Sequence, residues 1–328
     1  MKILVTGGTG FLGSHLVQRL AKKGEKVRVL VRKTSNIDYL KKLNVEIYPG
    51  DITDKSSLRE AVKGVDLVYH IAALFRQARF PDRVYWEVNV LGTRNILEVS
   101  YEEGVKRFVH CSTVGVLGNI TYPPANEDTP YNPGDIYQRT KCEGEKVALR
   151  FFKDKKFPVT VVRPTAIYGP GDLRLLKLFK YVSSGRIIIL GDGNILYHLV
   201  YVEDLVTGFE LCAEKETVIG KIYIIGGDNY LTLNELVDLI AKVLGVSLSK
   251  IYLPVFPVKV LSILCEKVCI PLRIEPPLYR RRVDFFTKSR AFDISKAKRE
   301  LGYKPEFDLE RGLKLTAEWY KEKGFFGR

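Results

Sequence analysis

The sequence predicts an α/β protein, with a doubly wound parallel sheet followed by a smaller C-terminal domain that binds substrate. Short apolar runs alternate with helical segments through the first half of the 328 residues. This order is typical of a parallel sheet covered by helices on both faces. A glycine-rich turn follows the first run, where such sheets bind a ligand. Because the alternation becomes irregular after Pro164, we predict domains at 1–164 and 165–328, with some later elements returning to the sheet.

Six apolar runs predict the strands of this sheet. They read KILVT, KVRVLV, VEIYPG, VDLVYHIA, KRFVHCST and VTVVRP. The segments between them have helical periodicity, at 11–23, 55–63, 84–103 and 137–155. This strand–helix order, with a glycine-rich first turn, is that of a dinucleotide-binding (Rossmann) domain.

The segment 252–277 departs from this order because it is apolar and rich in proline. One interpretation is an amphipathic segment over 258–270 that lies on a membrane, with Arg280, Arg281 and Arg282 on lipid phosphates. The prolines that interrupt a long surface helix here are Pro254, Pro257, Pro271, Pro276 and Pro277. We therefore favour a lid that lines the substrate pocket, and we expect no membrane partner.

The net charge of +14 raises nucleic acid or a membrane surface as partners. The basic residues are spread and mostly alternate with acids, so we favour a solvated basic surface that attracts an anionic substrate or a phosphorylated cofactor, and no nucleic-acid partner. Five cysteines without a CxxC pair or a histidine cluster predict reduced, buried thiols and no metal site. The first residues read as a buried strand rather than a secretion signal, so we expect a cytoplasmic protein.

The turn TGGTGFLG has the spacing of a loop that holds a dinucleotide pyrophosphate. Gly7 allows a tight turn, Gly10 allows the backbone to approach the anion, and Gly13 allows the following helix to pack close to the strand. The N–H groups at the start of that helix face the anion. The other residues of the predicted loop are Thr9, Phe11 and Leu12.

The second predicted strand ends in VLVRKTSN, without the acid that many NAD sites place on the ribose 2′-hydroxyl. Arg32 and Lys33 stand there instead. A guanidinium suits a 2′-phosphate, so NADP is favoured over NAD. The alternatives are an arginine that stacks on adenine and two solvated surface cations.

The segment YQRTK places Tyr137 and Lys141 four residues apart, on one face of a predicted helix. A nearby ammonium stabilises a phenolate and lowers the pKa of the tyrosine, which can then exchange a proton with a substrate hydroxyl. Ser112 and Thr113 lie at the end of a predicted strand, where a hydroxyl can bind the reacting oxygen. A glycine loop, a strand-end hydroxyl and Tyr-x-x-x-Lys in this order indicate hydride-transfer chemistry.

These motifs resemble the extended short-chain dehydrogenase/reductase family, which includes nucleotide-sugar epimerases and dehydratases. The likeness covers almost the whole chain. It rests on TGGTGFLG, GDITD, HIAA, NVLGTRNILE, CSTVGVLG, YQRTK, VVRPTAIYGPG, HLVYVEDL and DISKAKRELGY. The resemblance also implies an isologous homodimer, formed through the helices at 84–103 and 137–155.

Carried over by position, the resemblance implies further contacts to the cofactor. Asp51 and Ile52 would meet the adenine. Ala72 and Ala73 would border the ribose and pyrophosphate. Pro164 would pack near the nicotinamide.

For the chemistry, the resemblance implies a trio of catalytic residues. Thr113 matches the catalytic Ser/Thr of the family, with Ser112 beside it. Tyr137 would be the acid/base, and Lys141 would bind the nicotinamide ribose and tune the tyrosine. Asn89 would help to order the site.

The sequence departs from two branches of this family. The 4,6-dehydratases carry Asp-Glu after the catalytic Thr, whereas Val114 and Gly115 stand here, so dehydration is disfavoured. Sugar epimerases usually have Tyr where this chain has Leu117, and Arg-Asp where it has Tyr197 and His198. The second departure resembles dihydroflavonol reductases and hydroxysteroid dehydrogenases. We interpret His198 as a satisfied core histidine rather than a substrate ligand.

Two activities follow. We favour an NDP-sugar epimerase, which regenerates its bound cofactor, with an NADP-dependent reductase or dehydrogenase of an apolar ketone or alcohol as the alternative. The cationic candidates for a substrate diphosphate are Arg174, Lys177, Arg280, Arg281 and Arg290. A binding module without turnover is disfavoured by the intact set of Thr113, Tyr137 and Lys141.

Overall fold

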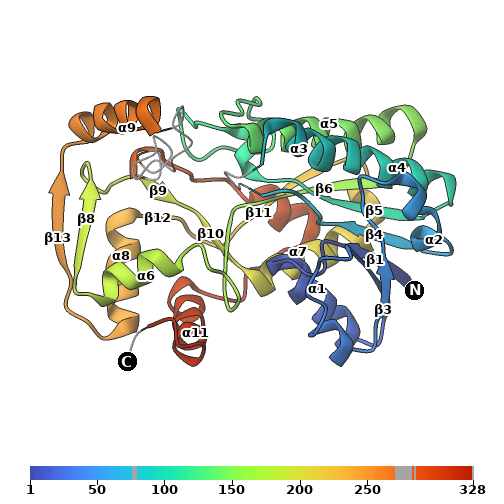
Figure 1. Ribbon diagram of the computed structural model, residues 1–328, viewed down its shortest axis with the longest axis horizontal. Helices are drawn as coiled ribbons and strands as arrows, with labels where there is room; N and C mark the ends of the chain where they lie inside the picture. Colours follow the sequence, from blue (N-terminus) through green and yellow to red (C-terminus); the bar gives the residue numbers. More distant parts are fainter. Residues whose placement is uncertain (76–79, 270–282, 284–285, 327–328) are drawn as a thin grey trace.

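Seven parallel strands form one sheet in the order β11-β6-β5-β4-β1-β2-β3 (Figure 1). The computed structural model describes residues 1–75, 80–269, 283 and 286–326. The strands are β1 (Lys2–Thr6), β2 (Lys26–Val31), β3 (Glu46–Pro49), β4 (Leu67–His70), β5 (Arg107–Cys111), β6 (Val159–Pro164) and β11 (Ile222–Ile225). All six predicted strands are confirmed, and the seventh comes from beyond Pro164.

Helices cover both faces of the sheet (Figure 1). One face carries α1 (Phe11–Lys22) and α7 (Val202–Glu214). The other carries α2 (Arg59–Val62), α3 (Asp82–Trp86), α4 (Thr93–Glu102) and α5 (Ile136–Lys155). A π-helical segment, Glu87–Gly92, joins α3 to α4, so the predicted helix at 84–103 is one rod with a local bulge.

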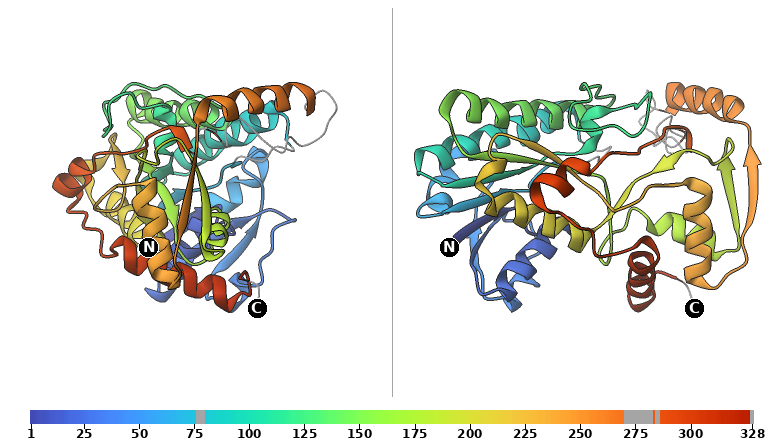
Figure 2. Two further views of the ribbon diagram at one scale, coloured as in Figure 1. Left: turned by 90° about the vertical axis from the view of Figure 1, so that its left-hand side faces the viewer. Right: turned by 180° about the vertical axis from the view of Figure 1, so that it is seen from behind.

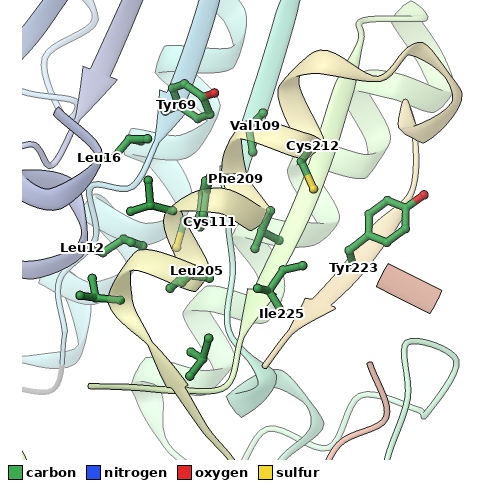
Figure 3. Packing of buried hydrophobic residues seen from close by; sticks show 14 of the residues in the cluster. Leu12, Leu16, Tyr69, Val109, Cys111, Leu205, Phe209, Cys212, Tyr223 and Ile225 are labelled. Atoms are coloured by element: carbon green, nitrogen blue, oxygen red, sulfur yellow. The ribbon is translucent and has the colours of Figure 1, made fainter. Parts of the chain in front are cut away.

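Each face of the sheet has its own apolar core, because successive strand residues point to opposite faces. Ile3 and Val5 of β1 pack under α1 and α7, whereas Leu4 packs under the α2–α5 layer. Figure 3 shows the first core, in which Leu16 of α1 and Phe209 of α7 meet Tyr69 of the sheet. Because the strands are buried on both faces, nearly every strand residue is apolar, and the strands appear in the sequence as near-continuous apolar runs.

The rest of the chain forms a second region of short strands and helices beside the carboxyl ends of the strands of the main sheet (Figures 1 and 2). Its strands are β7 (Ala166–Tyr168), β8 (Arg186–Leu190), β9 (Leu196–Tyr197), β10 (Leu199–Tyr201), β12 (Leu231–Thr232) and β13 (Ser249–Leu253). Its helices are α6 (Leu176–Ser183), α8 (Leu233–Leu244), α9 (Val255–Cys269) and α11 (Leu309–Glu322). A third apolar cluster links α6, α8 and α11. The boundary at Pro164 stays a prediction.

Helix α9 differs from the lid that we expected at 252–277. Pro257 lies in its first turn, where proline is tolerated, so the helix continues to Cys269. Its large apolar side chains are mostly exposed rather than packed into a pocket. Cys265 and Cys269 on this helix are half-buried, whereas the other three cysteines are buried as predicted. The prolines at 271, 276 and 277 lie outside the described residues.

Within the described ranges, no helix is long and apolar enough to cross a membrane. The same residues contain no cluster of three or more His, Cys, Asp or Glu side chains that could hold a metal ion.

Two buried histidines stack at the carboxyl ends of the central strands. His70 of β4 and His110 of β5 are register partners, with ring centroids 5.4 Å apart. His70 pairs through Nδ1 with Thr6 Oγ1 at 2.8 Å and through Nε2 with Thr93 Oγ1 at 3.0 Å. Burial, with a smaller effect of the Lys141 charge, lowers the pKa of His70 to about 3 and holds the pKa of His110 well below its usual range. Both rings are therefore neutral at physiological pH.

Neither ring nitrogen of His110 has a hydrogen-bond partner among the described residues. We therefore expect His110→Phe to change the free energy of unfolding at pH 7.5 by less than about 1.5 kcal/mol. The pKa of His110 in the folded protein lies below its usual value, so the wild type loses stability as the pH falls below about 6.5. The variant lacks this histidine, so its free energy of unfolding should decline less between pH 7.5 and pH 5. Urea denaturation at both pH values measures this.

His70→Phe is the matched control, because it removes the imidazole that hydrogen-bonds the buried hydroxyls of Thr6 and Thr93. It should cost about 1–3 kcal/mol at pH 7.5. An equal loss in the two variants would contradict the difference in hydrogen bonding.

Candidate active site

The glycine turn after β1 is shaped by contacts that no side chain tolerates. Gly7 has φ of +76°, and a Cβ there would lie 2.6 Å from the backbone nitrogen of Ala72. A Cβ on Gly13 would lie 2.1 Å from the carbonyl oxygen of Gly7. Glycine at these two positions therefore lets the turn pass β4 and lets α1 pack directly on the turn.

The start of α1 is open to an anion. Gly10 is its N-cap, no side chain of the described residues caps it, and its first turn holds no acid. Thr9 and Gly10 are exposed, and the first helical N–H groups belong to Phe11, Leu12 and Gly13. A helix N-terminus with free N–H groups favours phosphate, so this turn fits the pyrophosphate of a dinucleotide.

The neighbouring strand ends supply the other predicted cofactor contacts. Arg32 and Lys33 are exposed directly after β2, and the Tyr39 hydroxyl donates to the Gly8 carbonyl, which ties the segment after β2 to the glycine turn. The Asp51 carboxylate, after β3, accepts from the backbone nitrogen and hydroxyl of Thr53, both at 2.8 Å.

The apolar and small residues on that predicted list lie at the same edge of the sheet. Ile52 is buried, and its carbonyl accepts from Asn95 Nδ2 at 2.9 Å. Ala72 is half-buried and Ala73 exposed after β4. Pro164 ends β6 and is buried. All of these residues follow carboxyl ends of strands, the edge at which such sheets bind ligands.

Asn89 joins two segments of the site. Its Oδ1 accepts from Leu74 N at 2.7 Å, and its Nδ2 donates to Leu74 O at 3.2 Å and to Thr140 Oγ1 at 3.0 Å. It lies in the π-helical segment and is 1% exposed. The bulge therefore turns a buried amide toward both the loop after β4 and the helix that carries Lys141.

The structure separates the two hydroxyl candidates after β5. The Ser112 hydroxyl is buried and donates to the Glu145 carboxylate, and its place among the catalytic residues stays a prediction. Thr113 is half-buried, and its Oγ1 accepts from Gly115 N at 3.0 Å. Because that oxygen accepts from the backbone, its own proton is left to donate to a ligand.

Glu145 and Arg163 form a buried ion pair behind the site. Arg163 Nη2 lies 2.6 Å from Glu145 Oε1, and the two side chains are 2% and 0% exposed. Tyr131 donates to Glu145 at 2.7 Å, and Arg163 donates to the Glu127 carbonyl at 3.2 Å. With Ser112, this network links the end of β5, helix α5, strand β6 and the loop before α5.

Tyr137 and Lys141 lie on the inner side of α5, whose start is fixed by a capping box at Asp135. Lys141 is 3% exposed, and its Nζ donates to the Cys111 carbonyl at 2.6 Å. Burial lowers the pKa of Lys141. The Phe75 ring packs edge-on against Tyr137, with centroids 5.0 Å apart. Tyr137 thus lies one helical turn before Lys141 and against an apolar ring.

Arg174 covers the outer side of this region. Its guanidinium lies 5.8 Å from the centroid of Phe11 and 5.9 Å from that of Phe75. Asp172 holds it through a 2.7 Å contact to Nε. Arg174 therefore connects the start of α1 with the apolar ring beside Tyr137.

The other cationic candidates are more scattered. Lys177 is exposed on α6, with its Nζ over the Tyr181 ring. Arg290 is half-buried and hydrogen-bonds Tyr197. Arg280 and Arg281 lie outside the described residues.

His198 is a satisfied core histidine, as expected. It is 2% exposed, its Nε2 pairs with the Gly227 carbonyl at 2.8 Å, and its Nδ1 pairs with Phe292 N at 3.3 Å. Because a carbonyl only accepts and a backbone N–H only donates, the ring is a neutral tautomer with no nitrogen left for substrate.

Sequence reasoning missed Glu145 and Phe75. Glu145 follows Tyr137 and Lys141 at a further helical spacing of four, so it lies on the same side of α5, and this signal was present. Phe75 gave no signal, because its place against Tyr137 depends on the path of the loop after β4.

Glu145→Gln should destabilise the protein by about 3–5 kcal/mol, because it leaves the Arg163 charge buried without its partner. The free energy of unfolding in guanidinium chloride measures the loss. Glu143→Gln is the matched control on the same helix. Its exposed pair with Lys146 should be worth no more than about 1 kcal/mol. Equal losses would show that the buried pair has no special role.

Comparisons with known proteins show the family to which the chain belongs. A model of the NAD dependent epimerase/dehydratase family matches residues 3–226. Sterol demethylase protein B of Methylococcus capsulatus is 31% identical over 99% of each chain. A 3-beta-hydroxysteroid dehydrogenase of Mycolicibacterium neoaurum is 30% identical over 98% of this chain and 92% of its own.

Among solved structures, UDP-glucose 4-epimerase of Thermotoga maritima with UDP-glucose superposes with a TM-score of 0.79. It is 28% identical over 98% of this chain and 99% of its own. The protein therefore belongs to the NAD-dependent epimerase/dehydratase family, within the extended short-chain dehydrogenases/reductases, and is an NAD(P)-dependent enzyme of that type.

Proposed function

We propose that this enzyme is an NAD(P)-dependent dehydrogenase or reductase that interconverts a secondary alcohol and a ketone on an apolar, ring-containing substrate. The observation that carries this proposal is the Phe75 ring against Tyr137. It gives the space beside the acid/base an apolar wall, whereas a sugar would require hydrogen-bonding groups there. The names of the two curated relatives, a sterol demethylase protein and a hydroxysteroid dehydrogenase, support the same substrate class.

The sequence alone favoured an NDP-sugar epimerase, and that activity is the second candidate. The epimerase structure with UDP-glucose and the net charge of +14 support it. Against it, Tyr197 and His198, which replace the Arg-Asp of epimerases, are both buried. We therefore propose the dehydrogenase or reductase ahead of the epimerase.

Each catalytic residue has a role that its contacts support. The bound nicotinamide would accept or supply the hydride. The Thr113 hydroxyl, fixed by Gly115 N, donates a hydrogen bond to the substrate oxygen. Tyr137 exchanges the proton with that oxygen. Lys141, held by the Cys111 carbonyl, places a positive charge next to the phenolate and has donors left for the cofactor ribose.

We also propose that the cofactor is NADP, that the enzyme is cytoplasmic, and that it forms a homodimer through the rod α3–α4 and helix α5. The exposed Trp86 and Leu91 on that rod support the dimer, at 43% and 45% exposure. Light scattering after gel filtration tests it.

An assay of both substrate classes tests the main proposal. With NADP⁺ and a hydroxysteroid, the dehydrogenase should form reduced cofactor in proportion to the ketone produced. With a UDP-hexose, an epimerase would form the epimer without a net change in cofactor absorbance. Epimer formation with no turnover of the hydroxysteroid would overturn the proposal.

Tyr137→Phe should lower kcat by a factor of about 10²–10⁴ while cofactor binding persists, since only proton transfer is lost. Cofactor binding is measured by titration calorimetry. Tyr101→Phe, an exposed tyrosine on α4, is the control. Full activity of Tyr137→Phe would exclude the acid/base role.

Arg32→Ala should weaken NADP binding by about 1.5–3 kcal/mol, because a charged hydrogen bond to the 2′-phosphate is lost. NAD binding should change little. Lys22→Ala, at the far end of α1, controls for the loss of one positive charge. An equal loss for both cofactors would contradict the assignment of Arg32 to the 2′-phosphate.

A further inference from the structure

Helix α9 has its apolar side chains on the outside. Residues 251–268 contain eight of the 19 large hydrophobic residues exposed within the described ranges, so this short segment is where exposed apolar side chains concentrate. Phe256, Leu261, Leu264 and Val268 are between 54% and 77% exposed. Only Ser262 of the helix is buried. A surface helix of a globular protein normally has the opposite arrangement.

The exposed surface continues onto the strand before the helix. Ile251 of β13 pairs with Ile188 of β8, and these side chains are 47% and 53% exposed. In both views of Figure 2, α9 lies at the margin of the molecule. A contiguous apolar surface of this kind marks an interaction site rather than ordinary surface.

The charges on α9 favour one kind of partner. Lys259 and Lys267 are exposed on the helix, whereas its one acid, Glu266, is half-buried. The whole chain carries +14. A second copy packed here about a two-fold axis would bring another helix with an excess of positive charge against this one, whereas lipid phosphates would pair with the lysines.

The length of α9 fixes how it would lie. Its 15 residues span about 22 Å, too short to cross a bilayer. Lys259 and Lys267 are exposed on the same helix as the apolar and aromatic side chains, and a lysine can reach the headgroups from an apolar surface in the membrane interface.

We propose that α9 and the adjoining β8–β13 edge dock the enzyme on the surface of a bilayer that contains anionic phospholipid. The apolar side chains enter the acyl boundary, and Lys259 and Lys267 bind headgroup phosphates. This replaces our expectation of a pocket lid without a membrane partner.

Vesicle sedimentation of the full-length protein tests the proposal. The wild type should bind to vesicles of phosphatidylcholine with phosphatidylglycerol, and it should bind less to vesicles of phosphatidylcholine alone. Leu261→Ser/Leu264→Ser keeps every charge and should lower the partition coefficient by about tenfold or more. Tyr122→Ser/Tyr181→Ser removes two exposed rings elsewhere and should bind like the wild type.

A second measurement does not depend on a loss of binding. Phe256→Trp should show a blue-shifted emission with anionic vesicles and quenching by brominated lipid, whereas Tyr122→Trp should show neither. Absence of wild-type binding, or equal binding by the leucine double variant, would overturn the proposal. So would a dimer that this variant dissociates while vesicle binding persists, because a second copy would then cover α9.

Discussion

The site depends on one buried ion pair. Glu145 and Arg163 are almost fully removed from water and satisfy each other, with Tyr131, Ser112 and a backbone carbonyl completing their hydrogen bonds. The desolvation cost of such a pair can exceed its attraction, so its value is in fixing positions rather than in net stability. Here it fixes the end of β5, which continues into Thr113, relative to α5, which carries the tyrosine and the lysine.

A second constraint comes from the bulge between α3 and α4. Asn89 lies in this π-helical segment and contacts both Leu74 and Thr140. The loop after β4 carries Phe75, so the same amide sets where the apolar wall stands beside Tyr137. A buried amide of the helical layer thus positions the loop after β4 relative to α5.

Local patterns made the first half of the fold predictable from the sequence. Apolar strands and the spacing of Gly7, Gly10 and Gly13 report on backbone constraints that act over a few residues. Features that depend on packing between distant segments could not be predicted from such local patterns. The place of Phe75, the π-helical turn and the pairing of β11 with β6 depend on contacts between distant segments. Ser112 and Thr113 are adjacent and chemically alike, and the sequence does not show that the first donates to Glu145 whereas the second accepts from Gly115 N.

Tyr137, Lys141 and Glu145 project from the same side of α5 at successive turns. The proposed proton donor, the buried lysine and the carboxylate of the ion pair are therefore parts of one helix. A rotation or slip of this helix would displace all three together, so no intermediate docking of the helix retains part of the chemistry. The catalytic rate therefore reports whether α5 is packed against the sheet. Heat or denaturant should abolish activity as soon as this helix detaches from the sheet, even while the strands remain paired.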